Sequence, residues 1–269
     1  MSTTPTPPAS MINPRPSSAP KVMLIVGLSL IALVVLVGVI LAAVFVRGGP
    51  VNTTEDLPAG TSVSVDVPSA AFTFRPSTDG LVHLSAHGTY LGRKPTLSAE
   101  TSGGVTTITG GCSDQWFSFC SLDVTVTLPE SLALTVQGTN GGITASGLTG
   151  PLRLDTTNGA IETTGSQGVV DLHTTNGAIR VVDAASGQVT ATTTNGSVDA
   201  SFVAAPTTVV ATSTNGSITI RVPVDGVSYF VSARTTNGNT DTASVPNDRT
   251  STRTITAATT NGNVRVEPR

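Results

Sequence analysis

The stretch LRLDTTNGAI, residues Leu152–Ile161, decides the fold, because the chain repeats it with small changes. The next copy, VDLHTTNGAI, occupies Val170–Ile179. Seven Asn-Gly turns follow this pattern, at spacings of 18 to 24 residues. The seven turn asparagines are Asn140, Asn158, Asn176, Asn195, Asn215, Asn237 and Asn261.

The residues around each turn alternate between apolar and polar. The positions six and four residues before the turn asparagine are apolar in all seven repeats, and the third position after it is apolar in six. Positions six, four and two residues before the asparagine share one face of a strand, since strand side chains alternate between faces. Each repeat therefore predicts a strand, a bend at Asn-Gly and a second strand.

Two architectures fit this repeat. Asn-Gly favours a two-residue hairpin, and seven hairpins would form an antiparallel meander. Such a sheet would leave its apolar face uncovered, because residues 61–269 contain no amphipathic helix. We favour an all-β solenoid, a parallel β-helix that we expect to be right-handed, with one coil per repeat. The asparagines would stack in a hydrogen-bonded ladder, and each turn glycine would take the left-handed corner.

The predicted domain organisation has four parts. Residues 1–20 are a Pro-rich tail that we expect to be disordered and cytoplasmic. Residues 21–47 form a transmembrane helix and residues 48–60 a stalk. Residues 61–269 form an extracytoplasmic solenoid, in which residues 61–136 make irregular capping coils and residues 137–269 carry the Asn-Gly repeats. The charged end, residues 265–269, is expected at the last edge of the stack.

A long apolar segment predicts a membrane anchor. Val22–Val46 is 25 residues long, carries no charge, and is bounded by Lys21 and Arg47. It is longer than the apolar core of about 7–15 residues that a cleaved signal peptide has. We expect it to contact the lipid bilayer as a single-pass helix in the cell membrane. The basic residues of the N-terminal flank favour a cytoplasmic N-terminus and an extracytoplasmic C-terminal domain.

The two cysteines, Cys112 and Cys120, predict a disulfide, because an isolated pair outside the cytoplasm that closes a short loop is most simply oxidised. The loop carries Trp116, Phe117 and Phe119. These rings either form an exposed contact surface for a partner or fold inward to close the end of a core, and we favour the inward packing. The loop is nevertheless the best candidate contact surface in the sequence.

Catalytic and metal-binding patterns are missing from the sequence. His83 and His87 have no carboxylate or third histidine close in sequence, and His173 falls in an outward strand position. One acid or so occurs in each coil, without the convergence that glycan-cleaving enzymes need; these acids are Asp155, Glu162, Asp171, Asp183 and Asp199. We expect no enzyme activity, no cofactor and no metal. The net charge of −3, without a basic stripe, also excludes a nucleic-acid partner.

The run LDVTVTLPESLALTVQGTNGGITASGLTGPLRLDTTNGAI, residues Leu122–Ile161, resembles a bacterial domain family of unknown function that carries the label "putative adhesin". The resemblance covers about residues 60–266 and implies a β-helix behind a single membrane helix, without catalytic residues. It implies a non-catalytic, adhesin-like binding or structural protein of the cell envelope, whose partner is a cell-wall glycan or an envelope protein. The alternative is an envelope-stress sensor or an accessory subunit of a membrane signalling system.

Overall fold

The structure is a computed structural model that describes residues 19–45, 48–112 and 119–269. The chain forms two compact units, Met1–Arg47 and Gly48–Arg269, which are described separately. Most of the Pro-rich tail predicted for residues 1–20 lies outside the described residues. Trp116 and Phe117 of the predicted contact loop also lie outside them.

The first unit contains the helix α1, Ala19–Phe45. Its 27 residues span about 40 Å at 1.5 Å per residue, enough to cross a bilayer. The segment Met23–Ile40 has a mean hydropathy of 3.1, and none of it is buried against the protein. A helix of this length and composition is typical of a membrane anchor or of a signal sequence.

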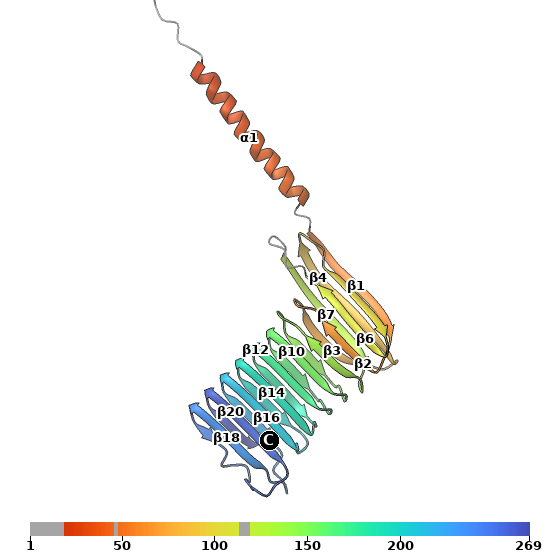
Figure 1. Ribbon diagram of the computed structural model, residues 1–269, viewed down its shortest axis with the longest axis vertical. Helices are drawn as coiled ribbons and strands as arrows, with labels where there is room; N and C mark the ends of the chain where they lie inside the picture. The colour runs from red at the N-terminus through yellow and green to blue at the C-terminus, as the bar shows by residue number, and fades with distance from the viewer. Residues whose placement is uncertain (1–18, 46–47, 113–118) are drawn as a thin grey trace, which may run out of the picture. The chain divides into compact units, whose positions relative to one another are not determined.

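The second unit consists of two sheets packed face to face (Figure 1). In sheet A the strand order is β1 (Gly48–Pro58), β4 (Leu81–Leu91), β7 (Phe119–Pro129), β3 (Ala71–Ser77), β9 (Ile143–Ser146), β11 (Ile161–Thr164), β13 (Ile179–Ala184), β15 (Val198–Phe202), β17 (Ile218–Val222), β21 (Val264–Pro268) and β19 (Thr240–Asp241). In sheet B it is β18 (Phe230–Asn237), β20 (Thr254–Asn261), β16 (Thr208–Asn215), β14 (Gln188–Asn195), β12 (Val170–Asn176), β10 (Leu152–Asn158), β8 (Ala133–Gln137), β2 (Ser62–Asp66), β6 (Val105–Gly111) and β5 (Thr96–Ser102).

The Asn-Gly repeats form a solenoid, as predicted, and not a meander of hairpins. Each coil contributes one strand to sheet B, bends at Asn-Gly and contributes the next strand to sheet A. Neighbouring coils pair in parallel with equivalent residues in register, so that Leu154 lies beside Leu172 and Asn158 beside Asn176. The repeated sequence therefore builds the stack by placing like residues next to like.

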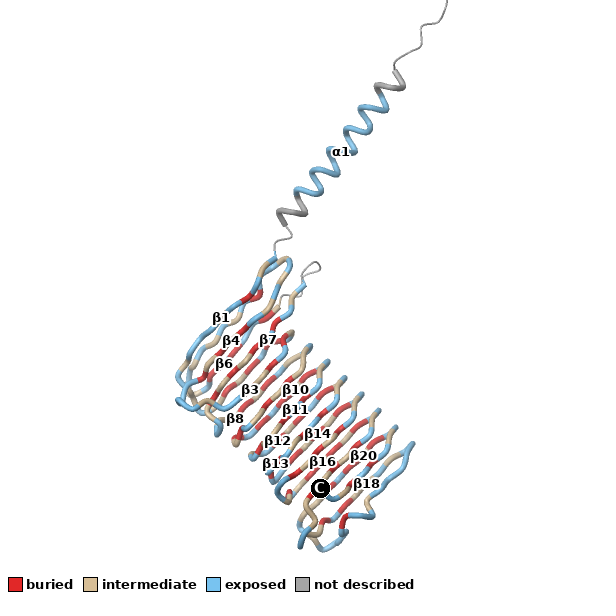
Figure 2. The backbone as a smooth tube through the Cα atoms, turned by 180° about the vertical axis from the view of Figure 1, so that it is seen from behind, coloured by how far each residue is buried: buried red, intermediate tan, exposed pale blue. Residues whose placement is uncertain are grey.

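The core lies between the two sheets and runs along the whole stack (Figure 2). The inward positions predicted six and four residues before each asparagine are buried, as for Leu154 and Leu172 at 0% exposure, except for the half-buried Ala233. The position two residues before is Thr or Ser in six repeats, and it is buried in five of them. Its hydroxyl donates to the carbonyl of the neighbouring coil's turn glycine, as from Thr174 to Gly159 at 2.9 Å. This bond satisfies a polar atom whose burial would otherwise be costly.

The seven turn asparagines form a continuous hydrogen-bonded ladder. Except in Asn140, each Nδ2 donates to the Oδ1 of a neighbouring asparagine at 2.7–3.0 Å. At one end of the ladder, the Asn140 Nδ2 lies 3.5 Å from the Ser69 hydroxyl oxygen. At the other end, Asn237 donates to Asn261.

The prediction that every turn glycine takes a left-handed corner is wrong for most coils. Of the seven, Gly141, Gly238 and Gly262 have positive φ, while the other four do not. Those four are required by close stacking instead. A Cβ atom on Gly177 would lie 1.9 Å from the carbonyl oxygen of Gly159, so only hydrogen fits between consecutive turns.

The order of the coils differs from their order in the sequence. The coil of β20 and β21 lies between the coil of β16 and β17 and the coil of β18 and β19. The prediction that residues 265–269 lie at the last edge of the stack is therefore wrong. The strands β18 and β19 form this edge. Ion pairs of 2.8 Å to Asp199 and 2.9 Å to Glu267 join Arg221 to both neighbouring strands of sheet A and help to hold β21 inside the stack.

The predicted stalk is also wrong, because Gly48–Pro58 forms β1, an edge strand of sheet A. All of its residues pair antiparallel with β4, and Val51 is 3% exposed. The Gly and Pro residues suggested a linker, but the Val-Asn-Thr-Thr core of the segment suits a strand. Only part of residues 61–136 forms coils: β2 and β3 continue the parallel stack, whereas β4–β7 and β5–β6 pair antiparallel.

Candidate functional site

The outer face of sheet B carries two columns of polar side chains that run along the stack. In the first column, strand pairing places Asp66, Gln137, Asp155, His173 and Thr192 side by side on five successive strands. In the second column, Arg153 lies beside Asp171. Neighbouring strands are about 4.8 Å apart, so each column presents polar groups at a fixed repeat distance.

Charged side chains in these columns pair across coils. The Arg153 guanidinium donates to Asp171 at 2.7 Å, and the His173 ring lies 3.4 Å from Asp155. All four side chains are more than 40% exposed, so these pairs add little to stability. Their value is that they hold charged groups of both signs in defined positions on the surface.

Two adjoining hollows lie over these columns, and we call them together the polar groove. One has a volume of about 260 Å³ and the other about 310 Å³. Asp155 lines both. The first is lined by Arg153, Leu154, Asp155, Asp171, His173 and Thr192, and the second by Asp66, Pro68, Gln137, Gly138, Thr139 and Asp155. Hydroxyl, amide, carboxylate, imidazole and guanidinium groups converge there, and the lining residues include no Phe, Tyr or Trp.

The five acids singled out in the sequence do not converge on one site. Asp155 and Asp171 lie on sheet B, whereas Glu162, Asp183 and Asp199 lie on sheet A. Asp183 and Asp199 are also engaged by Arg269 at 2.6 Å and Arg221 at 2.8 Å. Of the five, Asp155 and Asp171 therefore share the first hollow of the polar groove, and the other three lie away from it.

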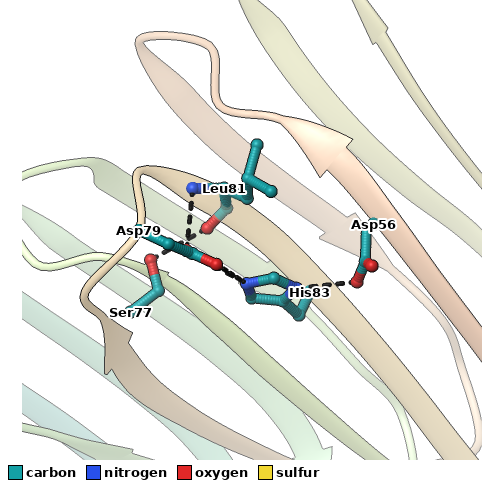
Figure 3. A network of polar contacts seen from close by, with 5 residues as sticks. All are labelled: Asp56, Ser77, Asp79, Leu81 and His83. Carbon is teal, nitrogen blue, oxygen red and sulfur yellow. Dashed lines mark hydrogen bonds and ion pairs between the residues drawn. The ribbon is translucent and has the colours of Figure 1, made fainter.

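His83 lies between two carboxylates (Figure 3). Its Nδ1 is 2.6 Å from Asp56 of β1, and its Nε2 is 2.8 Å from Asp79 in the turn before β4. Asp56 stands opposite His83 in the β1–β4 register, so strand pairing supplies this partner. The expectation that no carboxylate lies close in sequence is wrong, because Asp79 is four residues before His83. An imidazolium donates from both ring nitrogens, so the protonated ring suits both contacts.

These contacts shift both groups toward their charged forms. The hydrogen bond to Asp56, followed by the bond and attraction to Asp79, raises the pKa of His83 above 6.5. The Leu81 backbone N–H, with a smaller contribution from His83, lowers the pKa of Asp79 below 3.8. His87 contacts Ser85 and Asn52 instead of an acid. No group of three metal-ligating side chains occurs in the part of the chain that the structure describes.

The His83 contacts predict that β1 is held most firmly in mildly acidic buffer. The raised pKa of His83 means that its contribution is complete below about pH 6.5 and is lost as the pH rises through the folded value. The lowered pKa of Asp79 means that its contribution is complete above about pH 3.8 and is lost on further acidification. Hydrogen-exchange protection factors of β1 should therefore fall between mildly acidic and alkaline pH.

The control is His83→Gln, which keeps an amide donor but does not titrate in this range. In this variant the protection of β1 should not change with pH, while the protection of β12 should be the same in both proteins at every pH. An equal pH response of β1 in the two proteins would show that another group controls this strand.

The predicted disulfide between Cys112 and Cys120 is present, with an S–S distance of 2.04 Å. It joins the end of β6 to β7. The Phe119 side chain is 75% exposed, so the inward packing favoured from sequence is wrong for this ring. Phe119 is therefore available as a contact residue beside the disulfide.

The two parallel sheets, the stacked turns and the shared polar columns define a β-solenoid repeat protein preceded by an apolar helix. The profile of the Toastrack DUF4097 family matches residues 123–267, which is more than half of the chain. The chain belongs to this family.

Solved structures similar to this chain include proteins from Bacteroides fragilis and Parabacteroides distasonis. A putative adhesin from Bacteroides fragilis is 15% identical, with a TM-score of 0.50, over 81% of this chain and 97% of that one. A putative adhesin from Parabacteroides distasonis is 10% identical, with a TM-score of 0.45, over 82% and 98%. A putative lipid binding protein from the same species is 12% identical, with a TM-score of 0.40, over 82% and 98%. At 15% identity, the Bacteroides fragilis structure supports the fold alone. Comparison with curated proteins gave no match.

Proposed function

We propose that this protein is a non-catalytic, adhesin-like component of the bacterial cell envelope that binds a glycan through the polar groove. The helix α1 anchors it in the cell membrane as a single-pass protein, with the N-terminus in the cytoplasm and residues 48–269 outside. The observation that carries the proposal is the set of in-register polar side chains that line the two adjoining hollows.

The chemistry of the groove suits a polyhydroxylated ligand. A sugar presents hydroxyl groups that both donate and accept hydrogen bonds, and the groove offers both kinds of partner. Asp155 accepts, Gln137 donates and accepts, and Arg153 donates. The columns repeat along the stack, so an extended polymer could contact several coils at once, and multiple weak contacts would add.

The anchor is supported by the length and composition of α1 and by the absence of protein cover over Met23–Ile40. The disulfide supports an oxidising location for the second unit.

The test is binding of the full-length protein, in detergent micelles, to purified cell-wall glycan. Asp155→Ala should weaken binding about tenfold, because it removes a charged acceptor shared by both hollows. The matched control is Glu162→Ala on β11, an exposed acid of sheet A whose loss should leave binding unchanged.

Equal losses in the two variants would assign the effect to net charge and overturn the groove as the binding site. If the parent protein does not bind the glycan, the proposed ligand is wrong. If the protein instead binds an envelope protein, and this binding requires Phe119 and not Asp155, the contact surface is the disulfide loop.

A further inference from the structure

We infer that Asn237-Gly238 is a selective site of spontaneous deamidation, whereas the other six Asn-Gly turns are protected by the stack. All seven turns share the local sequence Thr-Asn-Gly, which is chemically prone to this reaction. Any difference in their rates must therefore come mainly from the fold. The inference does not depend on the proposed function.

The reaction needs the glycine nitrogen to reach the asparagine side chain. The backbone nitrogen of Gly238 attacks Cγ of Asn237, and a new N–Cγ bond forms as the Cγ–Nδ2 bond breaks. The proton lost by the nitrogen leaves with the side-chain amide as ammonia. Water then opens the resulting imide at either carbonyl, which gives aspartate or isoaspartate. Water is the only co-reactant.

In six turns the attacking nitrogen is held by the neighbouring coil. The N–H of the turn glycine donates to the backbone carbonyl of the next asparagine in the stack at 2.9–3.1 Å. These donors are Gly141, Gly159, Gly177, Gly196, Gly216 and Gly262. The bond must break, and the coils must separate locally, before the nitrogen can turn toward its own side chain.

Gly238 lacks this restraint because its coil is the last in the stack. The bond pattern ends where Gly262 donates to the Asn237 carbonyl, and the Gly238 N–H makes no hydrogen bond to the residues that the structure describes. Gly238 is exposed, whereas the other six turn glycines are half-buried, so water reaches Gly238 more readily.

The side chain of Asn237 is held less firmly than those inside the ladder. An internal asparagine such as Asn215 both donates from Nδ2 and accepts at Oδ1. Asn237 donates to Asn261 at 2.7 Å, and it stands at the end of the ladder, where no further asparagine donates to its Oδ1. The Asn237 side chain therefore has to break one hydrogen bond before it can rotate, whereas an internal asparagine has to break two.

Deamidation would also change the end of the stack. The product carboxylate cannot donate to the Asn261 Oδ1, and the Asn261 Nδ2 is already committed to Asn215. Two oxygens would then face each other where a hydrogen bond had been. The coil of β18 and β19 would be held less firmly. This end of the stack would therefore lose stability slowly as the protein ages.

The experiment is peptide mapping by mass spectrometry after the full-length protein has been held in warm, mildly alkaline buffer. Trypsin releases Thr235–Arg249 with Asn237 and Thr254–Arg265 with Asn261, so the end and internal positions are separated cleanly. Deamidation at Asn237 should be about tenfold faster than at Asn261, since an internal site must break at least one further hydrogen bond.

The same incubation in concentrated urea provides the control, because it removes the stack and keeps the sequence. All seven sites should then react at similar rates. Equal rates in the folded protein, or a faster reaction at any internal asparagine, would overturn the inference. As a second measurement, Asn237→Asp should raise hydrogen exchange in β18 and leave β12 unchanged; unchanged exchange in β18 would overturn the effect on the stack.

Discussion

Replacing Gly177 with alanine is expected to destabilise the solenoid by about 3 kcal/mol or more. The added Cβ would lie 1.9 Å from the Gly159 carbonyl oxygen and 2.5 Å from its carbon. Both are backbone atoms inside a hydrogen-bonded stack, so neither can move without shifting a whole coil. Thermal unfolding of the full-length protein, followed by circular dichroism of the strands, should show a Tm about 6–12 °C lower.

The matched control is Gly187→Ala, at the opposite corner of a coil. Its Cβ would meet only the Thr207 hydroxyl oxygen, at 3.9 Å, and its φ is outside the left-handed region. Alanine there should change the free energy of unfolding by less than about 1 kcal/mol. If the two variants melt at the same temperature, close stacking of the turns is not what requires glycine at position 177.

Deleting residues 254–269 is expected to lower the Tm by about 10 °C or more, because it removes a coil from inside the stack. This coil buries Ile255, Ala257, Val264 and Val266. It also supplies the strands that pair with β16 and β17 on one side and with β18 and β19 on the other. Without it, the coil of β18 and β19 has no strands to pair with, and the coil of β16 and β17 is exposed on one side.

Deletion of Arg269 alone is the control for this experiment. It removes the exposed ion pair to Asp183 and leaves every paired residue of β21 in place, so the Tm should change little. If the longer deletion also melts like the parent protein, β18 must pair directly with β16, and the observed coil order would not be needed for stability.

The strand pattern and the ladder could be predicted because the information is local. The apolar positions before each asparagine place Leu154 and Leu172 on the inner face whichever coil they neighbour. Asparagine at the same position of every coil makes the ladder a direct consequence of parallel stacking. The disulfide followed from there being two cysteines and a short loop.

The coil order could not be predicted because the sixth and seventh repeats present the same residues to a neighbour. Val231 and Ile255 are equivalent, as are Ala233 and Ala257, so either coil fits against β16. Contacts of other residues distinguish them, such as the pair of Arg221 and Glu267 at 2.9 Å. Neither partner belongs to the repeated pattern.

The candidate site was missed for a similar reason. The groove joins Asp66 to Gln137 and Asp155 through strand pairing across distant parts of the sequence. At His83 the sequence analysis overlooked Asp79, which is only four residues away. Asp56 reaches the ring only because Gly48–Pro58 is a strand and not a stalk. Long-range pairing therefore supplies the groove and one of the two His83 partners, and a repeat pattern alone carries no signal for it.

The inserted position of β20 and β21 also constrains how the protein can be made. A chain that emerges from the ribosome N-terminus first can add its early coils in the order of synthesis, each on the one before. The coil of β18 and β19 cannot pair in its final place as soon as it is synthesised, because its partners β20 and β21 have not yet been made. The seventh repeat must pair with β16 and β17 before the sixth can pair with the seventh. Folding of this end is therefore completed after translation and requires the whole repeat region.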